Sequence, residues 1–435
     1  MATCMATAAT STDRGPAMSE AHDDVLIVGG GVIGLSCALA LLDSGRGVRV
    51  LEAGTAGCGS SHGNCGTLTP SHAHPLASPG AIGKALRWMF TPDAPFYVAP
   101  RFDPALWRWL LAFAANCNAR DWRRGMDAKA ALLVGSRNAF PDWVARHAPD
   151  SEFREDGVDY VYRDRRALDE AARELPVFAE CGIASEVIDG AAYERREPAL
   201  KPGVAGVIRF PGDGSLRPDA YVAGLARSLR AAGGLLEEQR EVVDIMREDG
   251  GLLRVRTSAG EYRARDVIVA TGAWAPKLAR AAGLGRVPIQ PGKGYSMTYD
   301  RPALVPRGQI VLVERSVCVT TWGSGYRLGS TMELSGYDTS LNRRRMDALE
   351  RGAAEYLHDP VGPVKREEWF GWRPLTSDDV PIIGRAPGHE HLWLATGHGM
   401  LGVSMSPETA VLVADLVCGR TPRIDPAPYA PSRFA

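Results

Sequence analysis

Residues 23–54 read DDVLIVGGGVIGLSCALALLDSGRGVRVLEAG, and this stretch decides the fold. Residues 23–31 form an apolar run that ends in glycines, 32–45 have helical spacing and stop at Gly45, and 47–54 are a second apolar run. The order predicts a β-α-β unit. Because both strands are continuously apolar, the pattern predicts a parallel sheet that is buried on both faces.

The glycines of this unit follow the spacing G-x-G-x-x-G, at Gly29, Gly31 and Gly34. Gly29 permits a tight turn, Gly31 lets backbone N–H groups approach a pyrophosphate, and Gly34 lets the helix pack on the sheet. Glu52 ends the second strand, where an acid accepts a hydrogen bond from a ribose hydroxyl and disfavours the 2′-phosphate of NADP. A glycine turn alone is also compatible with a purely structural role. The strand, helix, second strand and acid together predict dinucleotide binding.

Two later segments favour FAD over NAD. Residues 266–274, DVIVATGAW, form an apolar strand that ends at Thr271 and Gly272 and offers a second backbone approach to the cofactor. Residues 392–416 predict a strand, a turn around His398, and a helix that begins near Ser406 and Pro407. The N-terminus of such a helix would stabilise the negative charge of a reduced flavin, which a nicotinamide does not require. His398 either lies beside the flavin or is a structural histidine with backbone partners.

Residues 60–74, SSHGNCGTLTPSHAH, allow two interpretations. The segment contains potential metal ligands, but a structural zinc site usually has four ligands in a closed geometry, and no regular spacing connects these residues to another ligand pair. We therefore predict no metal. We expect a cofactor loop in which polar side chains bond the pyrophosphate and flavin edge and two glycines let the backbone pass close. The potential ligands are His62, Cys65, His72 and His74; the loop residues are Ser60, Ser61, Gly63, Asn64 and Gly66.

The composition excludes several classes of protein. The 50 Lys and Arg residues balance the 51 Asp and Glu residues, which argues against a nucleic-acid partner. No apolar run is long enough to span a membrane, and residues 1–22 read as a disordered leader without the apolar segment of a signal peptide. The eight cysteines contain no C-x-x-C pair and favour a reducing, cytoplasmic setting.

These motifs, with GSSHGNCG (59–66), QPGKGYSMT (290–298), WFGWRPLTSDDVPIIG (369–384) and LWLATGHGMLGVSMS (392–406), resemble the FAD-dependent D-amino-acid dehydrogenases of the D-amino-acid oxidase superfamily. The resemblance covers residues from about 24 to 425. It implies FAD as cofactor, and hydride transfer from Cα of a D-amino acid to flavin N5 that yields the 2-oxo acid and ammonia. It also implies a respiratory acceptor, such as the quinone pool, at the cytoplasmic face of the inner membrane.

The expected fold is α/β, with a Rossmann-type FAD-binding domain and a discontinuous α+β substrate domain that contains an antiparallel sheet. We assign residues 23–80, 203–284 and 366–435 to the first domain, and 81–202 and 285–365 to the second. The expected cofactor contacts are Val28, Gly29, Gly30, Gly31, Val32, Ile33, Gly34, Glu52, Ser60, Ser61, Asn64, Gly66, Val243, Thr271, Gly272, Gly397, His398, Gly399, Leu401 and Gly402.

The expected catalytic residues are Arg373, Tyr295 and His398. The guanidinium of Arg373 can grip a substrate carboxylate by two parallel bonds, although a structural ion pair with Asp378 or Asp379 would equally employ an arginine. Tyr295 either hydrogen-bonds the substrate or packs in the core, and Tyr326 is a weaker candidate of the same kind. The sequence offers no compelling general base.

Several alternatives remain open at this stage. The SHGNCG loop departs from the SAANAG pattern of D-alanine-type enzymes, so D-proline, cis-4-hydroxy-D-proline, glycine or sarcosine are alternative substrates. A flavin-binding subunit without independent activity and an NAD-dependent dehydrogenase are further alternatives. Residues 82–113 either rest on a membrane interface or pack into the second domain; they include Arg87, Trp88, Arg101, Trp107, Arg108 and Trp109.

Overall fold

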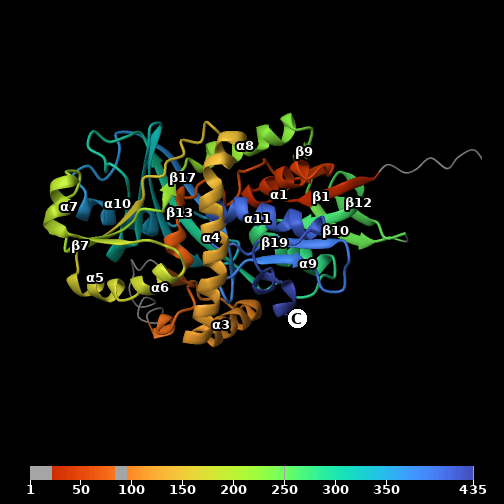
Figure 1. The fold of residues 1–435 in the computed structure, drawn as a ribbon, viewed down its shortest axis with the longest axis horizontal. Helices are drawn as coiled ribbons and strands as arrows, with labels where there is room; N and C mark the ends of the chain where they lie inside the picture. The colour runs from red at the N-terminus through yellow and green to blue at the C-terminus, as the bar shows by residue number, and fades with distance from the viewer. Residues whose placement is uncertain (1–21, 84–95, 249, 435) are drawn as a thin grey trace, which may run out of the picture.

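A computed structural model describes residues 22–83, 96–248 and 250–434. Residues 1–21 of the predicted leader, and Arg87 and Trp88, lie outside this part of the chain. The described residues form two large sheets, which lie side by side with the long helix α4 (Ala119–His147) in front of their junction (Figure 1). The fold class expected from the sequence, an α/β chain with a parallel β-α-β unit and a second, mainly antiparallel sheet, is confirmed.

The first sheet has eight strands and contains the predicted β-α-β unit. Strand β1 pairs in parallel with β2 on one side and with β12 on the other, and β12 also pairs with β19. Strands β11 and β12 form an antiparallel hairpin. The strands are β1 (Asp23–Val28), β2 (Val48–Leu51), β9 (Leu235–Glu237), β10 (Val242–Arg247), β11 (Leu253–Thr257), β12 (Gly260–Val269), β18 (Ile382–Arg385) and β19 (Leu392–Thr396).

Helices cover the first sheet and close its core. Helix α1 (Val32–Asp43) packs against α8 (Pro218–Ala231) and α11 (Gly402–Val417), and α11 in turn packs against α4. The buried residues Leu35, Leu39 and Leu229 belong to this core. Helix α9 (Ala275–Ala281) packs against β10, and its buried residues belong to a separate core. The core around α1 explains why the β-α-β segment is almost entirely apolar.

The second sheet has nine strands, in the order β17-β13-β16-β15-β14-β5-β7-β6, with β4 paired to β16. Most of its neighbours are antiparallel, and α10 packs on β16. Its strands are β4 (Phe96–Val98), β5 (Val158–Tyr162), β6 (Glu186–Asp189), β7 (Gly206–Phe210), β13 (Ile289–Tyr299), β14 (Gln309–Leu312), β15 (Val317–Trp322), β16 (Gly325–Leu334) and β17 (Lys365–Thr376).

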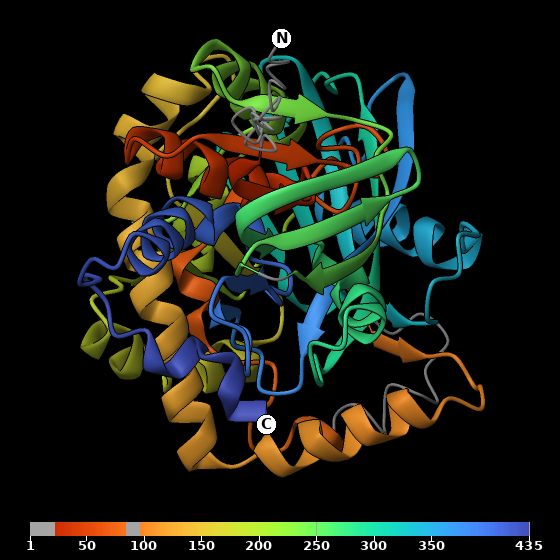
Figure 2. The ribbon, with the colours of Figure 1, turned by 90° about the vertical axis from the view of Figure 1, so that its right-hand side faces the viewer.

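The described residues also form further helices and a two-stranded sheet. The helices are α3 (Pro104–Asn116), α5 (Arg165–Ala172), α6 (Leu175–Glu180), α7 (Gly190–Arg196) and α10 (Arg343–Tyr356). Short 3-10 helices are η1 (Pro70–Ala73), η2 (Gly272–Trp274), η3 (Val313–Arg315), η4 (Ala427–Tyr429) and η5 (Pro431–Phe434), and β3 (Thr67–Leu68) pairs with β8 (Gly214–Ser215). Figure 2 shows α3 along the lower edge of the molecule, away from the first sheet.

Two segments assigned to the cofactor domain pair instead in the second sheet. Strand β7 pairs with β5 and β6, and β17 pairs with β13 along its whole length. Both pairings join strands that are far apart in the sequence, so local patterning could not reveal them. The sequence boundaries at 203 and 366 are therefore wrong as limits between the two sheets.

The start of the last helix also differs from the expectation. Helix α11 begins at Gly402 rather than near Ser406, and Pro407 lies inside it. Proline lacks the N–H that would bond one turn back. The hydroxyl of Ser406 donates to the carbonyl of Val403 at 2.9 Å and supplies a bond to this turn.

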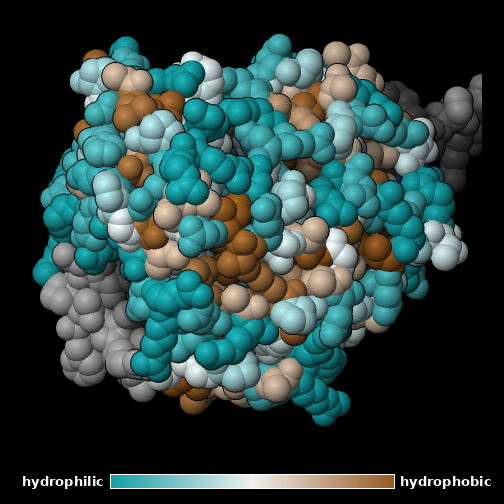
Figure 3. Space-filling model, turned by 60° about the vertical axis from the view of Figure 1, so that its left-hand side comes forward, coloured by the Kyte–Doolittle hydropathy of each residue, from teal (hydrophilic) through white to brown (hydrophobic). Residues whose placement is uncertain are grey.

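The surface is hydrophilic over most of the face drawn in Figure 3, and hydrophobic residues gather near its middle. Among the described helices, none combines the length and the apolar character that a membrane span requires.

Candidate active site

A cavity of about 1080 Å³ extends from the glycine-rich end of the first sheet to one face of the second. It contacts Gly31 at the start of α1, Glu52 at the end of β2, and Arg373 on β17. The cavity therefore joins the predicted nucleotide motif to the predicted substrate anchor, which are more than 300 residues apart in the sequence.

The nucleotide end of the cavity is made mainly of backbone. Gly29 has a φ of +111°, and a Cβ on Gly34 would lie only 1.9 Å from the carbonyl oxygen of Gly29. A Cβ on Gly31 would meet nothing closer than 3.6 Å, so that position is open. Gly29 and Gly34 thus allow the turn and the close helix packing, and Gly31 leaves the start of α1 accessible to a phosphate.

The carboxylate of Glu52 lies at this end and holds the turn together. Its two oxygens accept hydrogen bonds from the backbone N–H groups of Gly30, at 2.7 Å, and Gly54, at 2.8 Å. Val243 also faces the cavity from a bulge in β10, between Val242 and Asp244. Gly30 and Gly34 are not among the residues that line the cavity.

The loop at 60–66 is held from both sides. The hydroxyl of Ser61 accepts from the N–H of Val32, at 3.2 Å, while Ser60 donates to the carbonyl of Trp372. From the second sheet, Ser296 donates to the carbonyl of Gly63 at 2.8 Å. The loop therefore bridges the start of helix α1 and the second sheet, which carries Arg373.

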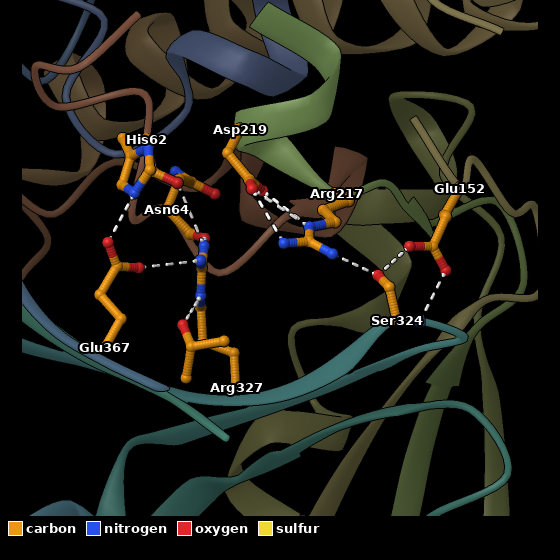
Figure 4. A network of polar contacts seen from close by, with 9 residues as sticks. His62, Asn64, Glu152, Arg217, Asp219, Ser324, Arg327 and Glu367 are labelled. Carbon is orange, nitrogen blue, oxygen red and sulfur yellow. Dashed lines mark hydrogen bonds and ion pairs between the residues drawn. The ribbon is translucent and has the colours of Figure 1, made fainter. Parts of the chain in front are cut away.

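A polar network fixes the same loop from below (Figure 4). The guanidinium of Arg327, only 1% exposed, donates to the carbonyls of His62, at 3.2 Å, and Asn64, at 2.7 Å. His62 pairs with Glu367 at 2.7 Å, and this bond raises the pKa of the imidazole. Cys65 lines the cavity, whereas His62 is not among the residues that line it.

One row of residues across the second sheet lies beneath this loop. We call it the sheet row; its members are directly opposed on neighbouring strands and so point to the same face. The row consists of Tyr160, Val311, Cys318, Gly329, Ser296 and Trp369, in the order of the strands. A Cβ on Gly63 would lie 2.0 Å from Trp369, and a Cβ on Gly329 would lie 2.6 Å from the sulfur of Cys65. The loop thus packs directly on the row at two glycines.

Arg373 faces this part of the cavity with one hydrogen bond already made. Its Nη1 donates to the carbonyl of Thr331 at 2.6 Å, and the guanidinium covers Gly294, where a Cβ would lie 2.2 Å away. Burial lowers the pKa of Arg373. No ion pair among the described residues joins Arg373 to a carboxylate; Asp378 pairs with Arg433 and Asp379 with Lys129. The alternative of a structural ion pair with those aspartates is therefore wrong.

The comparisons with known proteins agree with this geometry. Residues 24–416 match the family described as FAD dependent oxidoreductase. The chain belongs to this family of FAD-dependent oxidoreductases. It is 33% identical over 422 residues to a D-amino acid dehydrogenase of Cereibacter sphaeroides, covering 94% of this chain and 95% of that one. It is 34% identical over 410 residues to a D-amino acid dehydrogenase of Methylobacterium nodulans, covering 92% and 96%.

Solved structures give the same result for the fold. A glycine oxidase from Geobacillus kaustophilus superposes with a TM-score of 0.76 at 25% identity, covering 94% of this chain and 98% of that one. An L-proline dehydrogenase from P. horikoshii superposes with a TM-score of 0.70 at 19% identity, covering 95% and 98%. The second likeness concerns the fold alone.

The residues of this FAD-dependent oxidoreductase fit the cofactor. The start of α1 is open at Gly31, and the hydroxyl of Thr271, which lines the cavity, is buried without a hydrogen-bond partner. Helix α11 presents its N-terminus at Gly402 to the same cavity. These groups would hold the phosphates and the flavin edge of FAD. Of the predicted contacts, the cavity lining includes Val28, Gly29, Gly31, Val32, Ile33, Glu52, Ser60, Ser61, Asn64, Val243, Thr271, Gly272, Gly397, His398, Gly399, Leu401 and Gly402.

Gly66, by contrast, is not among the lining residues. It has a φ of +77°, and a Cβ there would lie 2.1 Å from the carbonyl oxygen of Leu216. Gly66 allows the backbone to pass close to Leu216 behind the cavity, and it does not contact the cavity. Glycine spacing alone could not separate these two uses.

The predicted catalytic residues other than Arg373 have partners within the protein. Tyr295 lines the cavity, but its hydroxyl donates to Glu333 at 3.3 Å and burial raises its pKa. Tyr326 is buried elsewhere and donates to the carbonyl of Pro360. The Nε2 of His398 shares a hydrogen bond with Thr409 at 3.1 Å, and burial lowers its pKa to about 3. His398 is therefore neutral near pH 7 and keeps its predicted place at the cavity.

A chain of hydrogen bonds that the sequence analysis missed begins at the far end of the sheet row. The hydroxyl of Tyr160 contacts Nδ1 of His72 at 3.3 Å and the hydroxyl of Ser71 at 2.8 Å, and Ser71 donates to Asp213. Asp213 is only 2% exposed, and burial raises its pKa to about 7. Burial also lowers the pKa of His72 to about 3. His72 thus joins a polar chain, and no group of three or more potential ligands placed for a metal occurs in the described part of the chain.

Proposed function

We propose that this protein catalyses the oxidative deamination of a D-amino acid to the 2-oxo acid and ammonia, with FAD as cofactor. The observation that carries the proposal is Arg373, a partly buried guanidinium that faces the cavity beside the sheet row and has no carboxylate partner among the described residues. The similarity to the D-amino acid dehydrogenases supports the choice of substrate class.

Arg373 would bind the substrate carboxylate. Its hydrogen bond from Nη1 to Thr331 fixes the plane of the guanidinium and leaves other N–H groups free to face the cavity. A fixed fork sets the orientation of Cα, and orientation accounts for a large part of the rate in such reactions. When bound, FAD supplies the acceptor for the hydride that leaves Cα.

The charge distribution around this end of the cavity suits an amino acid. The imidazoles of His72 and His398 are both neutral near pH 7, because burial lowers each pKa to about 3. Arg373 therefore attracts the carboxylate while neither imidazole repels the substrate ammonium group.

Replacement of Arg373 by alanine tests the proposal. We expect the variant to retain bound yellow FAD, because the guanidinium lies at the substrate end, and to show a KM for the D-amino acid that is raised about 100-fold or more. Arg366→Ala is the matched control on the same strand, since its side chain pairs with Asp300 at the surface. Loss of FAD from the Arg373 variant would assign it a structural role instead.

A second reaction of the same class is oxidation of glycine or of a cyclic imino acid. Because the chain superposes on a glycine oxidase with a TM-score of 0.76, the assay should include glycine. A panel of D-alanine, D-proline, cis-4-hydroxy-D-proline, glycine and sarcosine, measured by dye reduction and by oxygen consumption, separates the substrates and the oxidase from the dehydrogenase.

We further propose that the electrons pass to a membrane quinone at the cytoplasmic face of the membrane. Three apolar side chains on or beside α3 support membrane contact: Phe102 is 94%, Trp107 56% and Leu111 72% exposed. Trp109 on the same helix is buried and donates to the carbonyl of Leu375, so the helix is anchored on its other face. Sedimentation with anionic lipid vesicles tests the contact, and Trp107→Ser should reduce it.

A further inference from the structure

Two cysteine thiols face the cavity beside each other at the centre of the sheet row. Cys65 lies in the loop at 60–66, and Cys318 lies on β15. Both line the cavity and both are partly exposed. They are 253 residues apart in the sequence, so no local motif signals their proximity.

The strand register shows how close they are. Gly329 is directly opposed to Cys318, and Cβ positions of such a pair lie about 4.5–5.5 Å apart. The sulfur of Cys65 lies 2.6 Å from the position that a Cβ on Gly329 would occupy. Gly329 therefore leaves the space in which Cys65 approaches Cys318, and small rotations of the two side chains bring the sulfurs within bonding reach.

The two thiols differ in reactivity. The pKa of Cys65 is lowered, chiefly because the thiol of Cys318 donates a hydrogen bond to it, and Arg373 and Arg327 add positive charge nearby. The pKa of Cys318 is raised well above its usual value, chiefly by the same hydrogen bond and by burial. Cys65 is therefore the nucleophile of the pair.

We propose that Cys65 and Cys318 form a dithiol modification site that a small, uncharged organic disulfide oxidises to an intramolecular disulfide. The thiolate of Cys65 attacks one sulfur of the reagent, forms a mixed disulfide and releases one thiol. The sulfur of Cys318 then loses its proton, attacks the sulfur of Cys65 and releases the second thiol. Two protein thiols are oxidised, and one reagent disulfide is reduced to two thiols.

The position of the pair links this chemistry to activity. Strand β15 lies between β16, whose Thr331 accepts from Arg373, and the strands that carry Val311 and Tyr160. A bond between the sulfurs would lock the loop, which already packs on the sheet row, against the sheet where the substrate binds and so stop turnover. The disulfide can form whatever the substrate is. Only the predicted loss of activity rests on the proposed function.

The experiment treats the FAD-loaded protein with 2-hydroxyethyl disulfide and follows intact mass and D-amino acid dehydrogenation together. We expect Cys65 and Cys318 of the wild type to lose two hydrogens and retain no adduct, a digest to yield a crosslinked peptide that contains both, and the protein to lose most of its activity. Dithiothreitol should restore both the mass and the activity. A wild-type protein that keeps a stable adduct at either cysteine, or that stays fully reduced and active, would overturn the proposal.

Two variants and one control locate the site. Cys318→Ser should stop at the mixed disulfide on Cys65. Cys65→Ser should form neither the crosslink nor this mixed disulfide. Cys58→Ser is the matched control, because Cys58 also lines the cavity and is exposed, and its crosslinking should equal that of the wild type. If the crosslink forms and activity is not lost, the modification site is supported, but its proposed effect on substrate turnover is refuted. If either variant fails to hold FAD, the crosslinked peptide of the wild type decides alone.

Discussion

The two ends of the cavity are lined by different kinds of groups. At the nucleotide end, backbone N–H groups and glycines form the wall, and Gly29, Gly31 and Gly54 come from one contiguous run of 32 residues. At the substrate end, the wall consists of side chains, each from a different strand: Tyr160, Val311, Cys318 and Trp369. At the first end, a Cβ on Gly29 or Gly34 would overlap the backbone, whereas the second end can change its chemistry one side chain at a time.

The largest effect is expected at the nucleotide end, from Gly34→Ala. The added Cβ would lie 1.9 Å from the carbonyl oxygen of Gly29, which requires the backbone of α1 to move off the sheet. We expect loss of FAD binding and a drop in Tm of many degrees, since overpacking of this kind costs about 1–3 kcal/mol or more. Thermal unfolding and flavin absorbance measure both. Gly47→Ala is the control, because its Cβ would make only an ordinary contact, at 3.8 Å; equal behaviour of the two variants would refute the steric account.

A smaller effect is expected from Glu52→Ala. The substitution removes the acceptor for the N–H groups of Gly30 and Gly54 and the predicted partner of the ribose hydroxyl. Each lost bond to a charged acceptor is worth about 1.5–3 kcal/mol, so the Kd for FAD should rise by at least about tenfold. Fluorescence titration of the FAD-free protein measures it, and the order of preferred substrates should not change. An unchanged Kd would remove the ribose assignment.

The smallest effect is expected from Asp213→Asn at the far end of the sheet row. Burial raises the pKa of Asp213 to about 7, so the folded protein holds a proton there that the unfolded chain releases near pH 4. The stability that this proton contributes is complete below about pH 4 and is lost as the pH rises through about 7, a span worth a few kcal/mol. Urea unfolding of both proteins should be measured between about pH 4 and about pH 7. The free energy of unfolding of the wild type should fall as the pH rises, and that of Asp213→Asn should lack this fall. A wild type and variant with parallel profiles would contradict the assignment.

The two ends also differ in how far the sequence predicted them. The motif from Gly29 to Glu52 was predictable because its residues act through local geometry: a turn, a helix start and a strand end within one β-α-β unit. The loop at 60–66 was predicted from its Gly, Ser and Asn residues, and the resemblance placed Arg373 near the substrate. The sheet row, the pairing of Cys65 with Cys318, and the chain from Tyr160 to Asp213 depend on the register of strands that are distant in the sequence. Register is set by tertiary packing, so neither periodicity nor spacing could reveal these contacts.

The central claim is that FAD held at the glycine-rich end is reduced by a D-amino acid bound at Arg373. Anaerobic mixing of the FAD-loaded protein with each enantiomer of one amino acid, followed by flavin absorbance, tests it most directly. We predict that the D-enantiomer bleaches the yellow absorbance rapidly in the wild type and far more slowly in Arg373→Ala, and that the L-enantiomer leaves it unchanged. Equal bleaching by both enantiomers, or no bleaching by any amino or imino acid of the panel, would contradict the account.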